Sequence, residues 1–405
     1  MTVVKKSRTT TASVEAEVAL ARLRGSMDQA PASARAVAAL TQNPGCTRRR
    51  VIDAAGIPAH VLAERVRFPS TRGQSPFAIT SGNSFEEQLK GRSNYEGLAA
   101  ALRPFVDLPS EGLIVSDLND VGRCADPVAW KDARVAKTDD VLSKLARGDA
   151  DAPHIVDHPM LIMDLSGTSV YLEPDALAFR VGSDLELVEI KSYPIIDGQA
   201  DPSKVSATAG QSAVYILALR STLQRLGFDP EILRWSVILV APRNFGRQPT
   251  AHRVPLRKKA MSISRVLNGA TSMSDVLADL PEDLTLDVGE DESDISEDDA
   301  AEIARRLEMI PCLFVPECLS SCDLAAFCRE QAIRDDSPSR LGRQVRDVLG
   351  GVERLNDALA LAEADPLSVD EEFRDVAESL QSAMEALRRA RDSVAAGARR
   401  TRRRP

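Results

Sequence analysis

The sequence predicts a mixed α/β protein: a mixed central sheet flanked by helices, with a helical region before it and a helical hairpin after it. Three observations lead to this prediction. Short runs of apolar and β-branched residues gather between residues 160 and 193. A long helix and a further strand follow them, and apolar residues at helical spacing dominate the chain on either side.

Composition limits the class of protein. Of 405 residues, 43% are hydrophobic and 27% are charged, and this length allows one large domain or two to three ordinary ones. No apolar run approaches the ~18 residues of a membrane span, and residues 1–12 lack the apolar core of a secretory signal. We therefore expect a cytoplasmic protein with no membrane partner. Its six cysteines should be metal ligands, catalytic groups or buried apolar residues rather than disulfides.

The chain before the sheet is predicted to be helical. Helical patterns cover residues 14–23, 33–40, 46–66, 84–102 and 130–145. Gly82 and Asn83 are expected to break the chain before the fourth of these helices. We assign residues 1–40 to a flexible and helical N-terminal segment and residues 41–335 to the main domain.

The central stretch contains the predicted strands, which are residues 160–165, 169–172, 176–181 and 185–193. Gly167 and the pair Gly182 and Ser183 separate them, as is typical of an antiparallel meander. Asp201 and Pro202 then provide an N-cap and a first helical residue, so we expect a helix that ends at residue 226. Residues 235–241 should form a further buried strand.

The C-terminal part of the chain contains an acidic linker and a helical hairpin. Residues 282–299 are strongly acidic and are predicted to be solvated. Residues 336–405 are predicted to be helical, and Asp365 and Pro366 should divide them into a hairpin with a basic tail that could bind a protein partner. The first helix has a heptad seam formed by Leu341, Val345, Val348, Val352, Leu355 and Leu359.

Residues with catalytic chemistry concentrate at Asp175, Glu189 and Lys191. Glu189 and Lys191 are two apart on a predicted strand and project from one face, where burying both charges costs free energy unless a metal ion or substrate compensates. The carboxylates of Asp175 and Glu189 and the carbonyl of Ile190 suit Mg²⁺ or Mn²⁺, which activates water for phosphodiester hydrolysis. Lys191 would orient the nucleophile or stabilise the developing charge. The alternative interpretation is a surface ion pair, because the tripeptide Glu-x-Lys is common.

Gln211 and Tyr215 favour the metal site, because they lie four apart on one face of the next helix and could hydrogen-bond DNA or the catalytic groups. The chain resembles the PD-(D/E)XK nucleases of the RecB type in three motifs, which are Pro174-Asp175, Glu189-Ile190-Lys191 and Gln211-x-x-x-Tyr215. The resemblance covers the middle of the chain.

The resemblance implies a PD-(D/E)XK nuclease core that can bind up to two metal ions, with Asp175 and Glu189 as ligands and Lys191 as the catalytic lysine. Gln211 and Tyr215 would be the third motif of the family. It also implies a DNA substrate, single-stranded or at ends, and an exonuclease-like activity in DNA repair or in defence against foreign DNA.

Members of this family also place an acidic or histidine residue on a helix ahead of the sheet. Glu86, which follows residues 82–85, is similar to the acidic form and is our candidate. An exposed helix charge is an almost equally good interpretation of Glu86. The chain offers no clear equivalent of the family histidine, since His60 lies earlier and His154 and His158 lie directly before the predicted strands.

Cys318, Cys322 and Cys328 lie close enough in the sequence to hold a soft metal or a cluster, with a fourth ligand from elsewhere. Cys46 resembles the N-terminal cysteine of RecB-type nucleases in which one early and three late cysteines hold a [4Fe-4S] cluster. The resemblance implies an iron-sulfur site with a structural role at these four residues. The spacing between Cys318 and Cys322 is one residue longer than in most relatives. Cys312 as fourth ligand, structural Zn²⁺ and unligated buried thiols are the alternatives.

Three functions remain compatible with the sequence. They are an active DNA nuclease, a non-catalytic nucleic-acid-binding or partner-binding module that keeps the nuclease fold, and an interaction protein that acts through the helical hairpin. The net charge of -9 argues against a uniformly basic surface. Residues 243–259 and 399–404 are locally basic, however, and could attract a phosphate backbone irrespective of its sequence.

Overall fold

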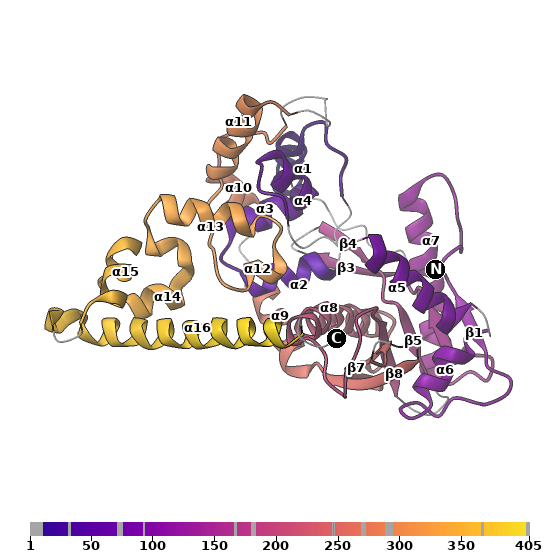
Figure 1. Ribbon diagram of the computed structural model, residues 1–405. Coiled ribbons are helices and arrows are strands. Elements are labelled where there is room, and N and C mark those ends of the chain that lie inside the picture. The colour runs from indigo at the N-terminus through magenta and orange to yellow at the C-terminus, as the bar shows by residue number, and fades with distance from the viewer. Residues whose placement is uncertain are drawn as a thin grey trace.

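The structure is a computed structural model, and it describes residues 11–30, 34–70, 76–91, 94–165, 168–179, 184–244, 246, 248–268, 273–287, 295–365 and 368–401. It confirms the mixed α/β fold predicted from the sequence, because a mixed central sheet is flanked by helices. Figure 1 shows the sheet and its covering helices in the lower part, a helical layer above them, and a C-terminal arm on the left.

The central sheet of the described chain contains, in spatial order, β1 (Val115–Asp117), β2 (Ile155–Asp157), β5 (Ala176–Ala178), β6 (Leu185–Ile190), β7 (Leu233–Pro242) and β8 (Pro249–Pro255). Strands β2, β5 and β6 are antiparallel neighbours, and β8 is antiparallel to β7. By contrast, β1 is parallel to β2 and β7 is parallel to β6. Strands β3 (Leu161–Leu165) and β4 (Thr168–Leu172) form a separate two-stranded sheet.

Helices cover both faces of this sheet, which is why every residue of β6 is buried. One face packs against α2 (Ala34–Gln42), α7 (Pro127–Arg147), α8 (Pro202–Arg225) and α9 (Arg257–Asn268), and the other against α5 (Pro76–Lys90) and α6 (Glu96–Leu102). Because side chains alternate along a strand, Leu187 packs on the α8 side and Val188 on the α5 side. In the described chain, no helix has the length and apolar character needed to cross a membrane.

The predicted meander is only partly present. The antiparallel pair β5–β6 and the hairpin β3–β4 occur as expected, but β2 and not β4 is the sheet neighbour of β5. Strands β1 and β2 have three residues each, too short for a detectable pattern. The strand predicted for residues 176–181 ends at Ala178, and the one for residues 185–193 ends at Ile190. Gly167, Gly182 and Ser183 lie outside the described residues.

Two predicted helices are each divided for local reasons. The helix predicted for residues 46–66 is α3 (Thr47–Ala55) and α4 (Ala59–Arg65), because Gly56 adopts a φ of 68° that ends α3 and Pro58 precedes α4. The break expected at Gly82 and Asn83 falls inside α5. The chain turns instead before α6, where Tyr95 has a φ of 66°.

A second apolar core lies in a helical layer that joins chain segments from before and after the sheet. The layer contains α1 (Thr11–Arg24), α3, α4, α10 (Met273–Ala278), α11 (Glu297–Glu308) and α13 (Ala325–Arg334), with α12 (Cys318–Ser321) leading into α13. The helix predicted for residues 14–23 is present as α1, but it shares this core with later helices and therefore belongs to the helical layer and not to an N-terminal segment outside the main domain.

The solvated linker predicted for residues 282–299 is wrong at both of its ends. Leu284 and Leu286 are buried in the core of the helical layer. Glu297 and the two aspartates after it form the acidic first turn of α11, which Ser296 caps. Residues 288–294 lie outside the described residues.

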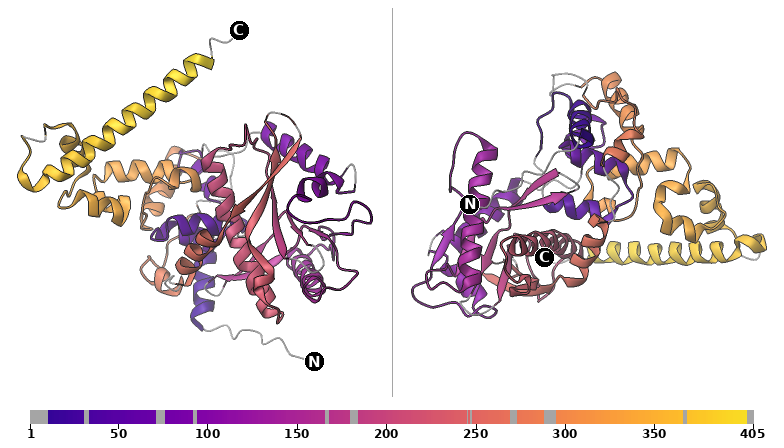
Figure 2. Two further views of the ribbon diagram at one scale, coloured as in Figure 1. Left: turned by 90° about the horizontal axis from the view of Figure 1, so that it is seen from below. Right: turned by 180° about the vertical axis from the view of Figure 1, so that it is seen from behind.

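The C-terminal arm contains three helices, α14 (Gly342–Leu349), α15 (Leu355–Glu363) and α16 (Arg374–Thr401). It also contains the 3-10 turns η2 (Pro338–Leu341) and η4 (Glu371–Phe373). Outside the arm, the 3-10 turn η1 (Pro230–Ile232) precedes β7. Helices α15 and α16 form the predicted hairpin around a small apolar cluster. The single heptad seam is wrong, because Gly350 (φ 58°) ends α14 and leaves Val348 and Leu359 exposed. Figure 2 shows α16 projecting from the rest of the protein.

Glu186 places a carboxylate inside the sheet, where the residue is 2% exposed. Arg253 on β8 lies 2.5 Å from Glu186 Oε1, and Arg234 lies 3.3 Å from the same oxygen. Burial raises the pKa of Glu186, and these two arginines oppose the shift. Arg253 therefore belongs to a structural ion pair, although the sequence placed it in a segment predicted to attract phosphate.

We expect Arg253→Ala to lower the free energy of unfolding by about 2 kcal/mol, because it leaves the buried Glu186 carboxylate to the more distant Arg234. Urea denaturation followed by circular dichroism measures the change. Lys258→Ala is the matched control, since Lys258 is an exposed basic residue on the next helix. Equal losses in the two variants would contradict a structural role for the pair.

Candidate functional site

Asp175, Glu189 and Lys191 meet at one end of strands β5 and β6. Asp175 immediately precedes β5, and the antiparallel register places it opposite Glu189 on β6. The Ile190 amide donates a hydrogen bond to Asp175 Oδ2 at 2.6 Å. Lys191 Nζ lies 3.7 Å from the same oxygen and also contacts Glu189 Oε1. The structure therefore brings together the residues that the sequence predicts as the reaction centre.

Glu189 is the most buried group of this site. Its side chain is 0% exposed, and Oε2 is buried without a hydrogen-bond partner among the described residues. Burial, and after it the charge of Asp175, raises the pKa of Glu189 to about 8, while Lys191 opposes the shift. Burial by itself lowers the pKa of Lys191, but the two carboxylates outweigh it and the pKa is raised. Asp175 and Glu189 thus share one ammonium, and without a further cation Glu189 is held largely in its protonated form near neutral pH.

Gln211 and Tyr215 hold the Asp175 segment from helix α8. Tyr215 is 4% exposed, and its hydroxyl donates to the Glu173 carbonyl at 2.9 Å while it accepts from Gln211 Nε2 at 3.0 Å. Burial raises the pKa of Tyr215, which keeps the hydroxyl a donor. From α7, Arg134 donates to both carboxylate oxygens of Glu173 at 2.7 and 3.2 Å. Arg134 carries no sequence signal, because an arginine inside a helix belongs to no motif.

Glu86 takes part in a neighbouring network of charges. It accepts a hydrogen bond at 2.6 Å from Lys90, one turn later on α5. Lys90 Nζ in turn lies 2.7 Å from Asp157 Oδ1, and its charge also acts on Glu189. Within the described residues, the hydrogen bonds and ion pairs of Glu86 join it to Lys90 and not to Asp175 or Glu189. Its predicted membership of the site is therefore at most indirect.

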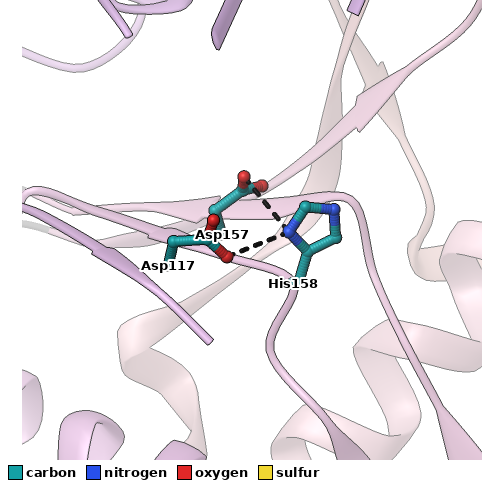
Figure 3. A group of neighbouring side chains, drawn as sticks. All are labelled: Asp117, Asp157 and His158. Atoms are coloured by element: carbon teal, nitrogen blue, oxygen red, sulfur yellow. Dashed lines mark hydrogen bonds and ion pairs between the residues drawn. The ribbon is translucent and has the colours of Figure 1, made fainter. Parts of the chain in front are cut away.

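Asp157 also forms a cluster with Asp117 and His158, which Figure 3 shows around the imidazole ring. His158 Nδ1 lies 3.1 Å from Asp117 Oδ1 and 3.2 Å from Asp157 Oδ2, and the candidate ligand atoms of all three residues lie within 4.8 Å of one another. Asp157 is already paired with Lys90, and it accepts a hydrogen bond from the Tyr95 hydroxyl at 2.7 Å. Because every charge in this cluster has an opposite charge beside it, we interpret the cluster as a structural ion network.

Five of the six cysteines gather in the helical layer, at the start of α3 and around α12 and α13: Cys46, Cys312, Cys318, Cys322 and Cys328. The backbone amide of Arg48 donates to the Pro311 carbonyl at 2.8 Å and ties the early segment to the late one. The predicted iron-sulfur ligands and the rival Cys312 therefore lie in the same part of the helical layer, and no three of these described sulfur atoms lie within 4.8 Å of one another. Cys124 is exposed and lies apart from them, before α7.

N–H groups point at the sulfur atoms of this cysteine cluster. Asn43 Nδ2 donates to Cys318 Sγ at 3.3 Å, and Arg48 Nη1 donates to Cys328 Sγ at 3.1 Å. Two backbone amides donate to Cys46, where they partly offset the rise in pKa that burial causes. Donors of this kind stabilise a thiolate more than a thiol, so the residues fit a metal-bound or cluster-bound sulfur.

Cys312 is coupled to the other cysteines. A hydrogen bond with Cys328 lowers the pKa of Cys312 to about 6, and the same bond raises the pKa of Cys328. Arg340 Nη1 lies 3.7 Å from Cys312 Sγ and favours the thiolate further. Cys46 and Cys312 thus stay as alternative fourth ligands, since both lie beside the late cysteines.

No protein-family model matches the chain, and no curated protein matches it. Among solved structures, the chain is similar to the crystal structure of a protein from Eubacterium rectale described as a "Putative exonuclease", with 14% identity and a TM-score of 0.25. The similarity covers 67% of this chain and 89% of that chain. At this TM-score it carries no argument about the function of this chain.

His158 makes stability depend on pH in a defined direction. Its hydrogen bond with Asp157 raises the pKa to about 9, above the ~6.5 of an unperturbed histidine. Its ion pairs therefore stabilise the fold fully below about pH 6.5, and this contribution is lost as the pH rises through about 9. We expect the urea midpoint of His158→Gln to differ more from the wild type at about pH 6 than at about pH 9.5.

The exposed His60 on α4 provides the control, because His60→Gln should change the midpoint little at either pH. A difference between wild type and His158→Gln that stays constant, or that grows with pH, would contradict the ion network.

Proposed function

We propose that the chain is a metal-dependent nuclease of the PD-(D/E)XK type whose centre is formed by Asp175, Glu189 and Lys191. The observation that carries the proposal is Glu189 Oε2, which is buried without a hydrogen-bond partner among the described residues. An unpaired buried polar atom costs about 1–3 kcal/mol, and more if it is charged. A cation at this oxygen would remove that cost.

The oxygen atoms available at the site fit a hard cation. The carboxylates of Asp175 and Glu189 and the carbonyl of Ile190 are the donors that Mg²⁺ and Mn²⁺ prefer. When bound, such an ion supplies an activated water and neutralises charge on a phosphate. Two of these donors, from Glu189 and Ile190, come from adjacent positions on β6, so the rigidity of a central strand would fix their relative positions.

Lys191 is suited to act on the substrate. Its side chain is 23% exposed, and its Nζ lies 3.7 Å from Asp175 Oδ2 and contacts Glu189, so it joins the buried Glu189 carboxylate to the surface. Its raised pKa keeps the ammonium charged. A charged lysine stabilises negative charge on a reacting phosphate and orients the attacking water, and it does not remove a proton.

DNA is the substrate that we propose, single-stranded or at ends, with exonuclease-like action in DNA repair or in defence against foreign DNA. Exposed basic residues on α9 and α16 support an affinity for phosphate that is independent of sequence: Arg257, Lys258, Arg388, Arg389 and Arg391. The hairpin of α15 and α16 is a candidate surface for a protein partner. A non-catalytic module that binds nucleic acid or a partner is the alternative function.

We further propose that Cys46, Cys318, Cys322 and Cys328 hold a [4Fe-4S] cluster, with structural Zn²⁺ as the alternative. The burial of Cys46, Cys318 and Cys328 and the N–H groups around the sulfur atoms support this proposal. The bound group would join the start of α3 to α12 and α13 and would stabilise the helical layer. Cys312 remains the rival for the fourth position.

We expect the purified protein to degrade linear DNA with Mg²⁺ or Mn²⁺, and Asp175→Asn, Glu189→Gln and Lys191→Met each to lower the rate by about 100-fold or more. The loss should follow because each variant removes an oxygen ligand or the charge that faces the phosphate. Cleavage of linear, circular, single-stranded and duplex DNA measures the activity and its substrate class.

Asp184→Asn is the matched control for the carboxylate variants. Asp184 lies at the opposite end of β6 and pairs with Arg234 at 2.7 Å, so its loss should leave activity unchanged. Equal cleavage by the wild type and by the Asp175, Glu189 and Lys191 variants would sink the proposed site. DNA binding without cleavage would favour the non-catalytic alternative.

We expect anaerobically purified protein to be brown and to contain about four iron atoms per chain. Cys322→Ser should lose most of the iron, whereas Cys124→Ser, at an exposed cysteine outside the cluster, should keep it. Comparing Cys46→Ser with Cys312→Ser identifies the fourth ligand. A colourless wild type with stoichiometric zinc would contradict the iron-sulfur assignment.

A further inference from the structure

Among the residues that the structure describes, Arg48 is a buried cation whose hydrogen-bond partners include no carboxylate. The residue is 1% exposed. Its guanidinium donates to the Ile310 carbonyl at 3.1 Å, to Cys328 Sγ at 3.1 Å and to Gln331 Oε1 at 2.9 Å. It also lies 5.4 Å from the centre of the Phe327 ring. The sulfur is the one atom of this set that can carry a full negative charge.

Two other arginines near the cysteine cluster differ from Arg48 in having a carboxylate beside them. Arg49 pairs with Asp53 at 2.5 Å. Arg340, which approaches Cys312, pairs with Asp335 at 2.7 Å. Of these three arginines, Arg48 is the one whose hydrogen-bond partners within the described residues include no carboxylate.

Burying a guanidinium costs several kcal/mol unless an opposite charge lies close to it. Protonated thiols do not supply that charge. Thiolates do, and four of them exceed the charge of a Zn²⁺ ion or of an iron-sulfur core, so the group that they hold is anionic. The position of Arg48 suits this role, because it lies two residues after Cys46 and donates to Cys328 on α13.

We infer that Arg48 is the internal counter-charge of the cysteine cluster, a positioning residue that favours the gathering of thiolates and sets how easily the bound group accepts an electron. The identity of the metal in this inference rests on the proposed iron-sulfur cluster, whereas the need for an anionic group comes from Arg48 itself. Removing a positive charge beside an anionic cluster makes its reduction harder. Removing a hydrogen-bond donor from a ligand sulfur also weakens metal retention.

The test compares the full-length wild type with Arg48→Gln, Arg48→Lys and Arg65→Gln. Arg48→Lys keeps the charge, and Arg65→Gln removes another buried arginine, 6% exposed, from α4 of the same helical layer. Each protein is purified anaerobically, its iron and zinc contents are measured, and it is titrated electrochemically while visible absorbance is followed. Release of iron to a chelator provides a second readout that does not depend on nuclease activity.

In Arg48→Gln we expect the ratio of reduced to oxidised cluster at a fixed potential to fall about tenfold, equal to about 59 mV for a one-electron couple. Iron release should be faster in the same variant. Arg48→Lys and Arg65→Gln should stay within about threefold of the wild type in that ratio. An unchanged potential in Arg48→Gln, or an equal shift in Arg65→Gln, overturns the inference.

If Arg48→Gln holds no cluster, Arg48→Lys decides the case. Retention of iron in Arg48→Lys supports the counter-charge, whereas loss in both variants shows that shape and not charge matters and overturns it.

A wild type that contains zinc and no iron ends the iron-sulfur proposal alone. Zinc release to a chelator then tests Arg48, with faster release expected in Arg48→Gln than in Arg65→Gln. A wild type that binds neither metal overturns the inference as well.

Discussion

The burial of the Glu189 carboxylate inside a sheet covered on both faces is the constraint on which the candidate site depends. Strand β6 lies between β5 and β7, so neither of its edges meets water, and helices exclude water from its faces. A carboxylate in that position is stable only with a positive partner, and Lys191 supplies one for a single oxygen. Asp175 adds a second negative charge. The architecture therefore favours the protonated form of Glu189 unless a cation binds, and Oε2 lacks a hydrogen bond within the described residues.

Positioning of Asp175 follows from the same architecture. Contacts from two helices hold the short loop before β5. Tyr215 on α8 binds the backbone of Glu173, and Arg134 on α7 binds its side chain. The buried Tyr215 hydroxyl thus fixes the backbone two residues before Asp175, the proposed metal ligand.

Charges on the two faces of the sheet differ in whether they have partners. On the α5 side, Lys90 pairs with both Glu86 and Asp157, and His158 pairs with Asp157. On the α8 side, Glu189 has an oxygen that lacks a hydrogen bond within the described residues. Ion networks that satisfy themselves hold a fold together, and an unsatisfied buried group indicates a ligand. Asp157 Oδ1 also lacks a hydrogen bond within the described residues, but it lies 2.7 Å from Lys90 Nζ, so the two clusters differ in the ion pair and not in the hydrogen bond alone.

The sequence predicts those elements whose stabilising contacts lie within a few residues, and it fails for elements that depend on distant parts of the chain. The strand that ends with Glu189 and Ile190, directly before Lys191, can be predicted from the sequence, and so can helix α8. Strand alternation and helix capping both depend on residues only a few positions apart. Strands β1 and β2 do not, because their three residues are set by pairing partners elsewhere in the chain. In residues 46–66, Gly56 and Pro58 are residue types that favour a break, but the spacing of the apolar residues favours one continuous helix. Arg253 has the same side chain whether it binds phosphate or Glu186, so only the fold distinguishes these roles.

The candidate metal centre and the cysteine cluster can be understood by one electrostatic argument with opposite signs. At the sheet, two carboxylates face one lysine, and the partner that we propose is a cation. In the helical layer, the hydrogen-bond partners of Arg48 in the described chain are one sulfur, one carbonyl and one amide oxygen without a carboxylate, and the partner that we infer is an anion. Desolvation of an ionised group costs free energy that neutral contacts do not fully return, so each imbalance favours a bound partner of opposite charge. The oxygen-ligated cation and the cysteine-held metal group that we propose would supply these two partners.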